Sequence, residues 1–355
     1  MSERVVVAMS GGVDSSVAAA LLVEQGFEVV GITLRLSSGA SRCCSLEDAD
    51  DARRVADALG IRFYVADYAD AFRREVIEPF ADAYLGGRTP IPCVACNQRF
   101  KFRHLLDRAR SLGAESVATG HYARIAADPA GGGLVLRRAR DAGKDQSYFL
   151  FDLDQERLAR VRFPVGELSK AEVRACARRL GLAIAEKPES QEICFVPDGD
   201  YAALVEQVRP TALPGPGDVV DETGRVLGRH AGVHHFTVGQ RRGLGVASGR
   251  RLYVKSIDAA RNQVRVAPAE ALGASGAALA GVTWIAGAAP REPLPAWVRV
   301  RHRHAGAAAT VEPLAGGRAR VRFDAPVAAV APGQAAVFYA ADAVLGGGWI
   351  AEALA

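Results

Sequence analysis

The fold is decided by VVVAMSGGVDSS at residues 5–16, where an apolar strand runs through two glycines into an apolar helix that begins near Val17. Glycines let the backbone approach an anion closely, and the free N–H groups of a helix start face it, so this order predicts a phosphate cradle. It is not a Walker A loop, because no Gly-Lys-Ser/Thr follows the first glycine at the required distance. The alternative is an ordinary turn in which Asp14 or Ser15 caps the helix. The strand and the complete motif favour the nucleotide site.

The composition is typical of a soluble globular protein: 355 residues, 49% hydrophobic and 24% charged, a length that suggests two or three domains. The first apolar strand is too short for the core of a signal peptide, and no stretch approaches the roughly 20 apolar residues of a membrane span. We therefore expect a cytoplasmic protein with no membrane partner. Its six cysteines should stay reduced, which favours metal binding or sulfur chemistry over a disulfide framework.

The net charge of +4, from 44 basic and 40 acidic residues, indicates little by itself. The basic residues gather in separate groups, at 99–110, 241–242, 250–251 and 299–304. Such groups suit a long polyanion such as RNA. Solvated faces rich in arginine have the same pattern, so charge alone leaves both interpretations open.

Up to about residue 200, apolar strands alternate with helices, which predicts an α/β fold with a doubly wound parallel sheet and ligands at the carboxyl ends of its strands. Strands are expected at 29–34, 62–65 and 116–119, and helices at 47–59 and 169–180. The last helix begins with a capping box of Ser169 and Glu172, and Cys176 falls on its apolar face as a core residue. The segment that leads from residue 87 through 97 is too rich in proline for a helix.

The sequence pattern changes near residue 200. A stretch rich in proline and glycine, at 210–217, leads into hairpins expected at 217–227 and 252–267. From about residue 275, strands alternate without helical periodicity, which predicts a small closed β-barrel. The chain is therefore divided into an α/β domain at 1–200, a small central domain at 201–272 and a barrel at 273–355.

Four further motifs accompany the glycine loop: CVACN at 93–97, KDQSYFL at 144–150, SQEICF at 190–195 and FTVGQRRGLG at 236–245. Together the five blocks resemble the tRNA-specific 2-thiouridylases, a family of the ATP pyrophosphatase (PP-loop) superfamily. The resemblance covers nearly the whole chain. It implies an N-terminal domain for adenylation and sulfur transfer and a barrel that contacts tRNA. It also implies that ATP and Mg²⁺ activate the C2 oxygen of the wobble uridine, which sulfur then replaces to give 2-thiouridine, AMP and pyrophosphate.

The resemblance assigns roles to single residues. Nucleotide binding is implied for Ala8, Met9, Ser10, Gly11, Gly12, Val13, Asp14, Ser15, Leu34 and Gly120. Contact with tRNA is implied for Ile91, Pro92, Cys93, His121, Lys144, Asp145, Gln146, Arg301, His302 and Gln334. Cys96 corresponds to the catalytic nucleophile and Cys194 to the persulfide carrier, which implies a Cys96–Cys194 disulfide during turnover. A cysteine desulfurase or a sulfur-relay protein is the expected sulfur donor.

Cys93 departs from the family pattern, because many members have an aspartate there that has been cast as a general base. A thiol does not simply inherit that role, since its unperturbed pKa is about 8.5 rather than about 4. Cys93, Cys96 and Cys194 together offer three thiolates, enough to hold a [4Fe–4S] cluster with one iron left open. The other alternative is a structural zinc site that pairs the CxxC with Cys43 and Cys44.

Two rival functions stay open from the sequence. The first is another PP-loop ligase that adenylates a small molecule, which needs neither the CxxC nor a basic barrel. Measuring whether ATP–pyrophosphate turnover depends on tRNA distinguishes this ligase from a tRNA-thiolating enzyme. A non-catalytic protein that binds a metal or RNA is the second rival. The intact glycine loop argues against it, and failure to bind ATP would revive it.

Overall fold

A computed structural model describes residues 2–37, 46–129, 131–188, 193–196 and 199–355. Its first sheet is parallel, with the strand order β3-β2-β1-β4-β7. The strands are β1 (Arg4–Ala8), β2 (Glu28–Arg35), β3 (Arg62–Asp67), β4 (Ser116–Thr119) and β7 (Val161–Arg162). Because β1 lies between β2 and β4, the glycine loop that follows β1 opens at the middle of the sheet's carboxyl edge.

Helices cover both faces of this sheet, which confirms the doubly wound α/β prediction. Along β1, Val5 and Val7 pack in one buried apolar cluster and Val6 in another. The first cluster is covered by α1 (Val13–Glu24), α2 (Leu46–Ala58) and α8 (Lys170–Arg179). The second is covered by α3 (Ala69–Phe72), η1 (Arg73–Ile77), α4 (Glu78–Leu85), α5 (Pro92–Cys96), η2 (Asn97–His104) and α6 (Leu105–Ser111).

Two sequence expectations about helices need correction. The CxxC segment is helical after all, because Pro92 is the first residue of α5, where the missing N–H would have no partner in the helix anyway. In α8, the capping box of Ser169 and Glu172 is confirmed, with a Ser169 Oγ to Glu172 N distance of 3.3 Å. Cys176 packs against the apolar cluster on this face of α8, as expected, but it is half-buried rather than fully enclosed, and its Sγ lies 3.4 Å from an Arg179 nitrogen.

A second sheet has the order β10-β11-β8-β9 and contains both predicted hairpins. Its strands are β8 (Gly217–Val220), β9 (Val226–His230), β10 (Tyr253–Asp258) and β11 (Gln263–Ala267). The chain reaches it through α9 (Tyr201–Val208), which packs against α4. A short turn of helix, η5 (Val233–His235), follows β9 and lies beside α9.

The remaining strands close into a barrel, as predicted, because β12 pairs with both β15 and β17. The ring is formed by β12 (Gly273–Trp284), β15 (Arg318–Ala328), β14 (Ala307–Leu314), β13 (Leu294–Arg299), β16 (Ala335–Ala340) and β17 (Ala343–Leu354), after a short turn η6 (Ala269–Leu272). Its interior is filled by small and branched residues such as Val298, Val311 and Val321.

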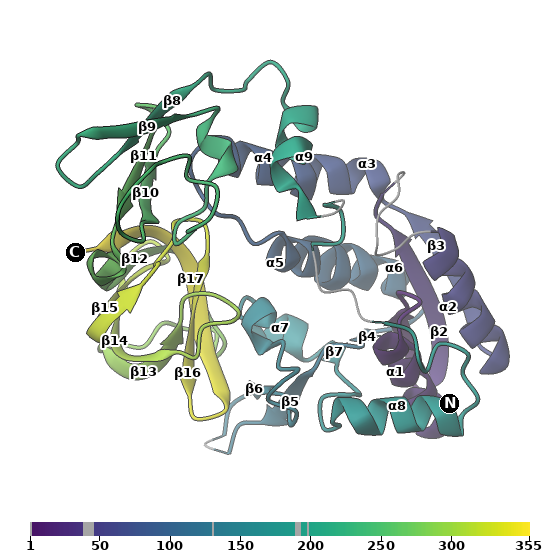
Figure 1. The fold of residues 1–355 in the computed structure, drawn as a ribbon. Helices are drawn as coiled ribbons and strands as arrows, with labels where there is room; N and C mark the ends of the chain where they lie inside the picture. The colour runs from purple at the N-terminus through teal and green to yellow at the C-terminus, as the bar shows by residue number, and fades with distance from the viewer. Residues whose placement is uncertain (1, 38–45, 130, 189–192, 197–198) are drawn as a thin grey trace.

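One connection was not predicted from the sequence. A hairpin within the first 200 residues, β5 (Ala123–Ala127) with β6 (Leu134–Arg138), pairs with β17 of the barrel. Arg124 and Arg137 each lie 2.8 Å from a different oxygen of Asp342 in the turn before β17. The segments η3 (Ser147–Leu150) and α7 (Gln155–Leu158) both contact β6. Figure 1 shows α7 beside β6. The domain boundaries at residues 200 and 272 stay a prediction.

Within the described residues, no helix combines the length and apolar character that crossing a membrane requires.

Candidate active site

The glycine loop after β1 is built by close backbone approach. Gly11 has a φ of +68°, a conformation that residues with a side chain rarely adopt. Gly120, at the end of β4, is needed for a second reason: a Cβ there would lie 2.5 Å from the Ser15 nitrogen. Gly12 is the N-cap of α1, and among the described residues no side chain caps it, so neither Asp14 nor Ser15 has the capping role of the alternative interpretation. The N–H groups of the first turn can therefore receive phosphate oxygens.

Hydroxyl groups hold the shape of this loop. The Oγ of Ser15 accepts a hydrogen bond from the Ser10 N–H at 3.1 Å and donates one to the Gly12 carbonyl at 3.1 Å. Ser16 donates to the same carbonyl at 2.9 Å. The loop is therefore organised before any nucleotide arrives, which suits a site that must position a triphosphate.

Two lysines that the sequence analysis missed stand beside the loop. The Lys170 Nζ, from the first residue of α8, lies 2.7 Å from Asp14 Oδ1, and the Tyr122 hydroxyl donates to the same oxygen at 2.7 Å. The Lys187 Nζ lies 3.2 Å from the Gly11 carbonyl. Partial burial opposes its charge, but ion pairs with Asp48 and Asp51, at 2.8 and 2.6 Å, raise the pKa of Lys187 above its ordinary value.

A cavity of about 330 Å³ opens between the loop and helix α5. It brings together residues from several separate stretches of chain, among them the three cysteines that the sequence singled out. Its lining includes Ala8, Met9, Ser10, Asp14, Ser15, Leu34, Pro92, Cys93, Cys96, Lys101, Gly120, His121, Gln146, Phe149 and Cys194. Cys93 is exposed, and Cys96 and Cys194 are half-buried. Cys43 and Cys44, the partners of the alternative zinc site, lie outside the described residues.

His121 is buried in the wall of this cavity. Its Nδ1 lies 2.7 Å from the Thr119 Oγ1 and its Nε2 lies 3.4 Å from the Lys101 Nζ. Burial, with the Lys101 charge adding to it, lowers the pKa of His121 well below its ordinary value. The imidazole is therefore neutral at neutral pH. Beside it, the Gln146 Oε1 accepts a hydrogen bond from the Tyr122 N–H at 2.9 Å, which fixes the side-chain amide at the cavity wall.

The other residues expected to meet tRNA lie around the barrel junction. Asp145 is buried, and its carboxylate lies 3.2 Å from Arg299 of β13. The ring of His302 lies 4.5 Å from that of Phe149, which lines the cavity. Gln334 donates to the Thr89 carbonyl at 3.0 Å. These contacts join the barrel to the cavity, and the tRNA contacts themselves stay a prediction, as they do for Ile91, Lys144 and Arg301.

A glycine loop of this form, at the carboxyl edge of a parallel sheet and facing cysteines across one cavity, defines a PP-loop nucleotide-binding protein with thiol chemistry. Three family models match the chain: "tRNA methyl transferase HUP domain" at residues 3–198, "tRNA methyl transferase PRC-barrel domain" at 204–268 and "Aminomethyltransferase beta-barrel domain" at 275–350.

Full-length relatives narrow the assignment. The chain is 54% identical to the tRNA-specific 2-thiouridylase MnmA of Geobacter metallireducens, over 99% of this chain and 98% of that protein. It is 51% identical to the enzyme of the same name from Geotalea uraniireducens, covering 99% and 96%, and 52% identical to that of Rhodospirillum centenum, covering 99% and 92%. The chain belongs to the tRNA-specific 2-thiouridylase family.

Proposed function

We propose that this protein is a tRNA-uridine 2-sulfurtransferase, which adenylates the C2 oxygen of the wobble uridine and then replaces it with sulfur. The observation that carries the proposal is the shared cavity, in which the nucleotide loop faces Cys96 and Cys194. A ligase acting on a small molecule has no use for these thiols, and a non-catalytic binding protein has no use for the preorganised loop. The relatives' names agree with this function.

The residues of the loop suit the phosphates of ATP. The first N–H groups of α1 and the loop amides bind the phosphate oxygens, Gly120 leaves room for them, and the backbone of Leu34 meets the adenine. Mg²⁺ offsets triphosphate charge, and Asp14 is the carboxylate in the loop that would hold it. Lys170, which pairs with Asp14, is placed to offset triphosphate charge as well.

Sulfur replaces the activated oxygen by way of the two thiols. A persulfide on Cys194 carries the sulfur, and the Cys96 thiolate attacks its inner sulfur, so that hydrosulfide leaves and a Cys96–Cys194 disulfide forms. The hydrosulfide attacks C2, the C2–O bond breaks, and AMP leaves with its electron pair. An external thiol then reduces the disulfide. Direct attack by the persulfide on C2 is the shorter alternative.

Cys93 lines the same cavity and is left without a covalent role in this route. The alternative is that all three thiolates hold a [4Fe–4S] cluster. Protein purified without oxygen distinguishes the two: iron-free protein that thiolates tRNA at full rate supports the persulfide route, and strict dependence on reconstituted iron supports the cluster. In the persulfide route, Cys93→Asp keeps iron-free activity.

The partners follow from the chemistry. The anticodon region of tRNA enters the cavity past the segment 91–93, and the barrel's basic residues at 299–304 meet its backbone. A cysteine desulfurase or a relay protein loads Cys194. Because free thiols are needed at every turnover, we place the enzyme in the cytoplasm.

The test uses the purified full-length chain with labelled ATP, with and without unmodified tRNA. We expect AMP and pyrophosphate to form only when tRNA is present, and 2-thiouridine to appear once sulfide is added. Turnover of ATP that ignores tRNA would contradict it in favour of a small-molecule ligase. Failure to bind ATP would favour a non-catalytic protein.

A further inference from the structure

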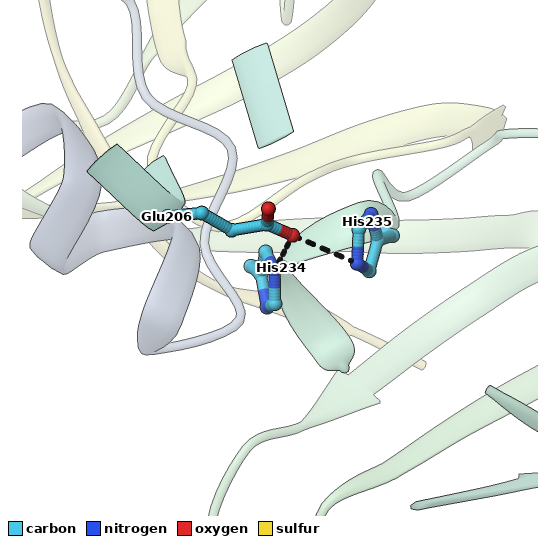
Figure 2. A group of neighbouring side chains, drawn as sticks. All are labelled: Glu206, His234 and His235. Carbon is cyan, nitrogen blue, oxygen red and sulfur yellow. Dashed lines mark hydrogen bonds and ion pairs between the residues drawn. The ribbon is translucent and has the colours of Figure 1, made fainter. Parts of the chain in front are cut away.

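A cluster of two histidines and a glutamate lies outside the cavity described above, between α9 and the turn η5. Figure 2 shows Glu206 of α9 pointing at both His234 and His235. One carboxylate oxygen, Oε1, lies 3.2 Å from the Nε2 of His234 and 3.5 Å from the Nε2 of His235. The three donor atoms all lie within 4.8 Å of one another.

These distances match the spacing of ligands around a small tetrahedral ion. Zinc binds imidazole nitrogen and carboxylate oxygen at about 2.0–2.1 Å, so two such ligands at a tetrahedral angle lie about 3.3 Å apart. The two measured separations, 3.2 and 3.5 Å, bracket that value. The third separation, between the two histidine nitrogens, is no more than 4.8 Å, so the three atoms are near enough to share one ion.

The surroundings favour an ion with one side open to water. His234 is almost fully buried, at 2% exposed, and its ring is held against Gly232, where a Cβ would lie 2.5 Å from the imidazole. His235 and Glu206 are partly exposed, and His235 also borders an open cavity of about 620 Å³.

We propose that Glu206, His234 and His235 bind a divalent transition-metal ion, with zinc the best match and water completing its coordination. Two imidazoles and a carboxylate suit such ions, whereas Mg²⁺ and Ca²⁺ prefer all-oxygen sites. The ion joins α9, which begins a few residues after Cys194, to the loop that follows β9. It therefore fixes α9 against the turn that follows β9 of the second sheet, and this role does not depend on the proposed sulfur transfer.

The test measures binding of Co²⁺ and Zn²⁺ to the full-length protein after treatment with a chelator and a reductant. Cobalt separates this site from the cysteines, because thiolate ligands add a strong near-ultraviolet charge-transfer band that a nitrogen and oxygen site lacks. The variants are Glu206→Gln and His235→Ala, both partly exposed positions that can change without opening a core. The matched control is His104→Ala, since His104 lies 3.7 Å from Glu75 without a second histidine in the pair.

Wild type and His104→Ala should each bind one cobalt ion with a spectrum free of the thiolate band, and zinc should raise their unfolding temperature. Glu206→Gln and His235→Ala should lose that ion, with binding weaker by about 100-fold or more. The proposal would be overturned if wild type bound no cobalt ion with a spectrum free of the thiolate band, or if the variants bound that ion as well as wild type does. The cluster would then be held by hydrogen bonds alone. His234→Ala is a second check, with its fold verified by circular dichroism.

Discussion

Asp14 is the residue at which the nucleotide loop meets the rest of the site. Its Oδ1 receives both the Lys170 ammonium and the Tyr122 hydroxyl, at 2.7 Å each. No sequence pattern indicates this meeting, because Asp14 and Lys170 are 156 residues apart. The sequence placed Asp14 in a phosphate loop, and only the packing of α8 against α1 brings the lysine to it.

Replacing Asp14 tests the nucleotide part of the site. Asp14→Asn keeps the shape but removes the charge that pairs with Lys170 and is proposed to hold Mg²⁺. We expect AMP formation to fall by about 100-fold or more, while the affinity for tRNA changes by only a few-fold, as measured by filter binding. Asp107→Asn, on the exposed side of α6, is the control. Wild-type pyrophosphate release by Asp14→Asn would refute the assignment.

Replacing the two active-site cysteines tests the sulfur-transfer part of the site. Cys96→Ser and Cys194→Ser should each eliminate 2-thiouridine yet still form AMP with tRNA, because activation needs the loop and the uridine oxygen while sulfur delivery needs both thiols. Cys176→Ser is the matched control, a half-buried cysteine on α8. Digestion of the tRNA followed by mass spectrometry measures the product. Thiolation retained in either active-site variant would break the pair assignment.

At the scale of elements, the sequence predicted the parts whose signals are local. The strands β1, β2 and β4 are short apolar runs, and the capping box of α8 is a spacing within one turn, so each was found. The helix at the CxxC was missed because the number of prolines was considered without their positions. Pro92 does not disrupt α5, because it is the first residue of the helix. The β5–β6 hairpin has a local signal, the glycine turn at 131–133, that the sequence analysis did not assign to a hairpin. Its pairing with the barrel was missed because its partner, β17, lies some 200 residues away.

The turn between η3 and α7 holds a buried acid with a pH signature. Asp152 is 7% exposed, and apart from its own backbone no described residue bonds its carboxylate oxygens. Burial raises the pKa of Asp152 from an ordinary 3.8 to about 7. The folded state therefore holds a proton that the unfolded state releases, so this group lowers the free energy of unfolding as pH rises from about 4 to about 7.

Asp152→Asn removes that titration. The variant should gain stability relative to wild type as pH rises, reaching a difference on the order of 2–4 kcal/mol at pH 8 compared with pH 4. Urea unfolding of both proteins at several pH values measures it. A difference between the two that stays constant from pH 4 to pH 8 would show that Asp152 does not titrate in this way.

For the whole molecule, the structure links the barrel to the cavity through buried contacts. Arg299 of β13 pairs with Asp145, and the ring of His302 lies 4.5 Å from that of Phe149, so the barrel sits against the cavity wall. The sequence predicted both the barrel and its basic group but not their junction with the cavity, because that junction depends on long-range packing.

Arg301 tests the tRNA surface of the barrel. Its side chain is exposed and donates only to the Ala328 carbonyl among the described hydrogen bonds, at 3.2 Å. Arg301→Ala should weaken tRNA binding and reduce the dependence of log K on log salt by about one unit, without changing the affinity for ATP. Arg318→Ala, an exposed barrel arginine that also bonds one backbone carbonyl, is the matched control. Binding curves of Arg301→Ala that overlay those of wild type would show that Arg301, in the bend after β13, is merely solvated.

The proposed function of this protein is to make 2-thiouridine at the wobble position of tRNA. The most direct measurement is mass spectrometry of wobble nucleosides in tRNA from cells that lack the gene, with the wild-type chain or Cys194→Ser restored. We expect 2-thiouridine to be absent in cells that lack the gene, to return when the wild-type chain is restored and to stay absent with Cys194→Ser. Unchanged 2-thiouridine in the cells that lack the gene would contradict it.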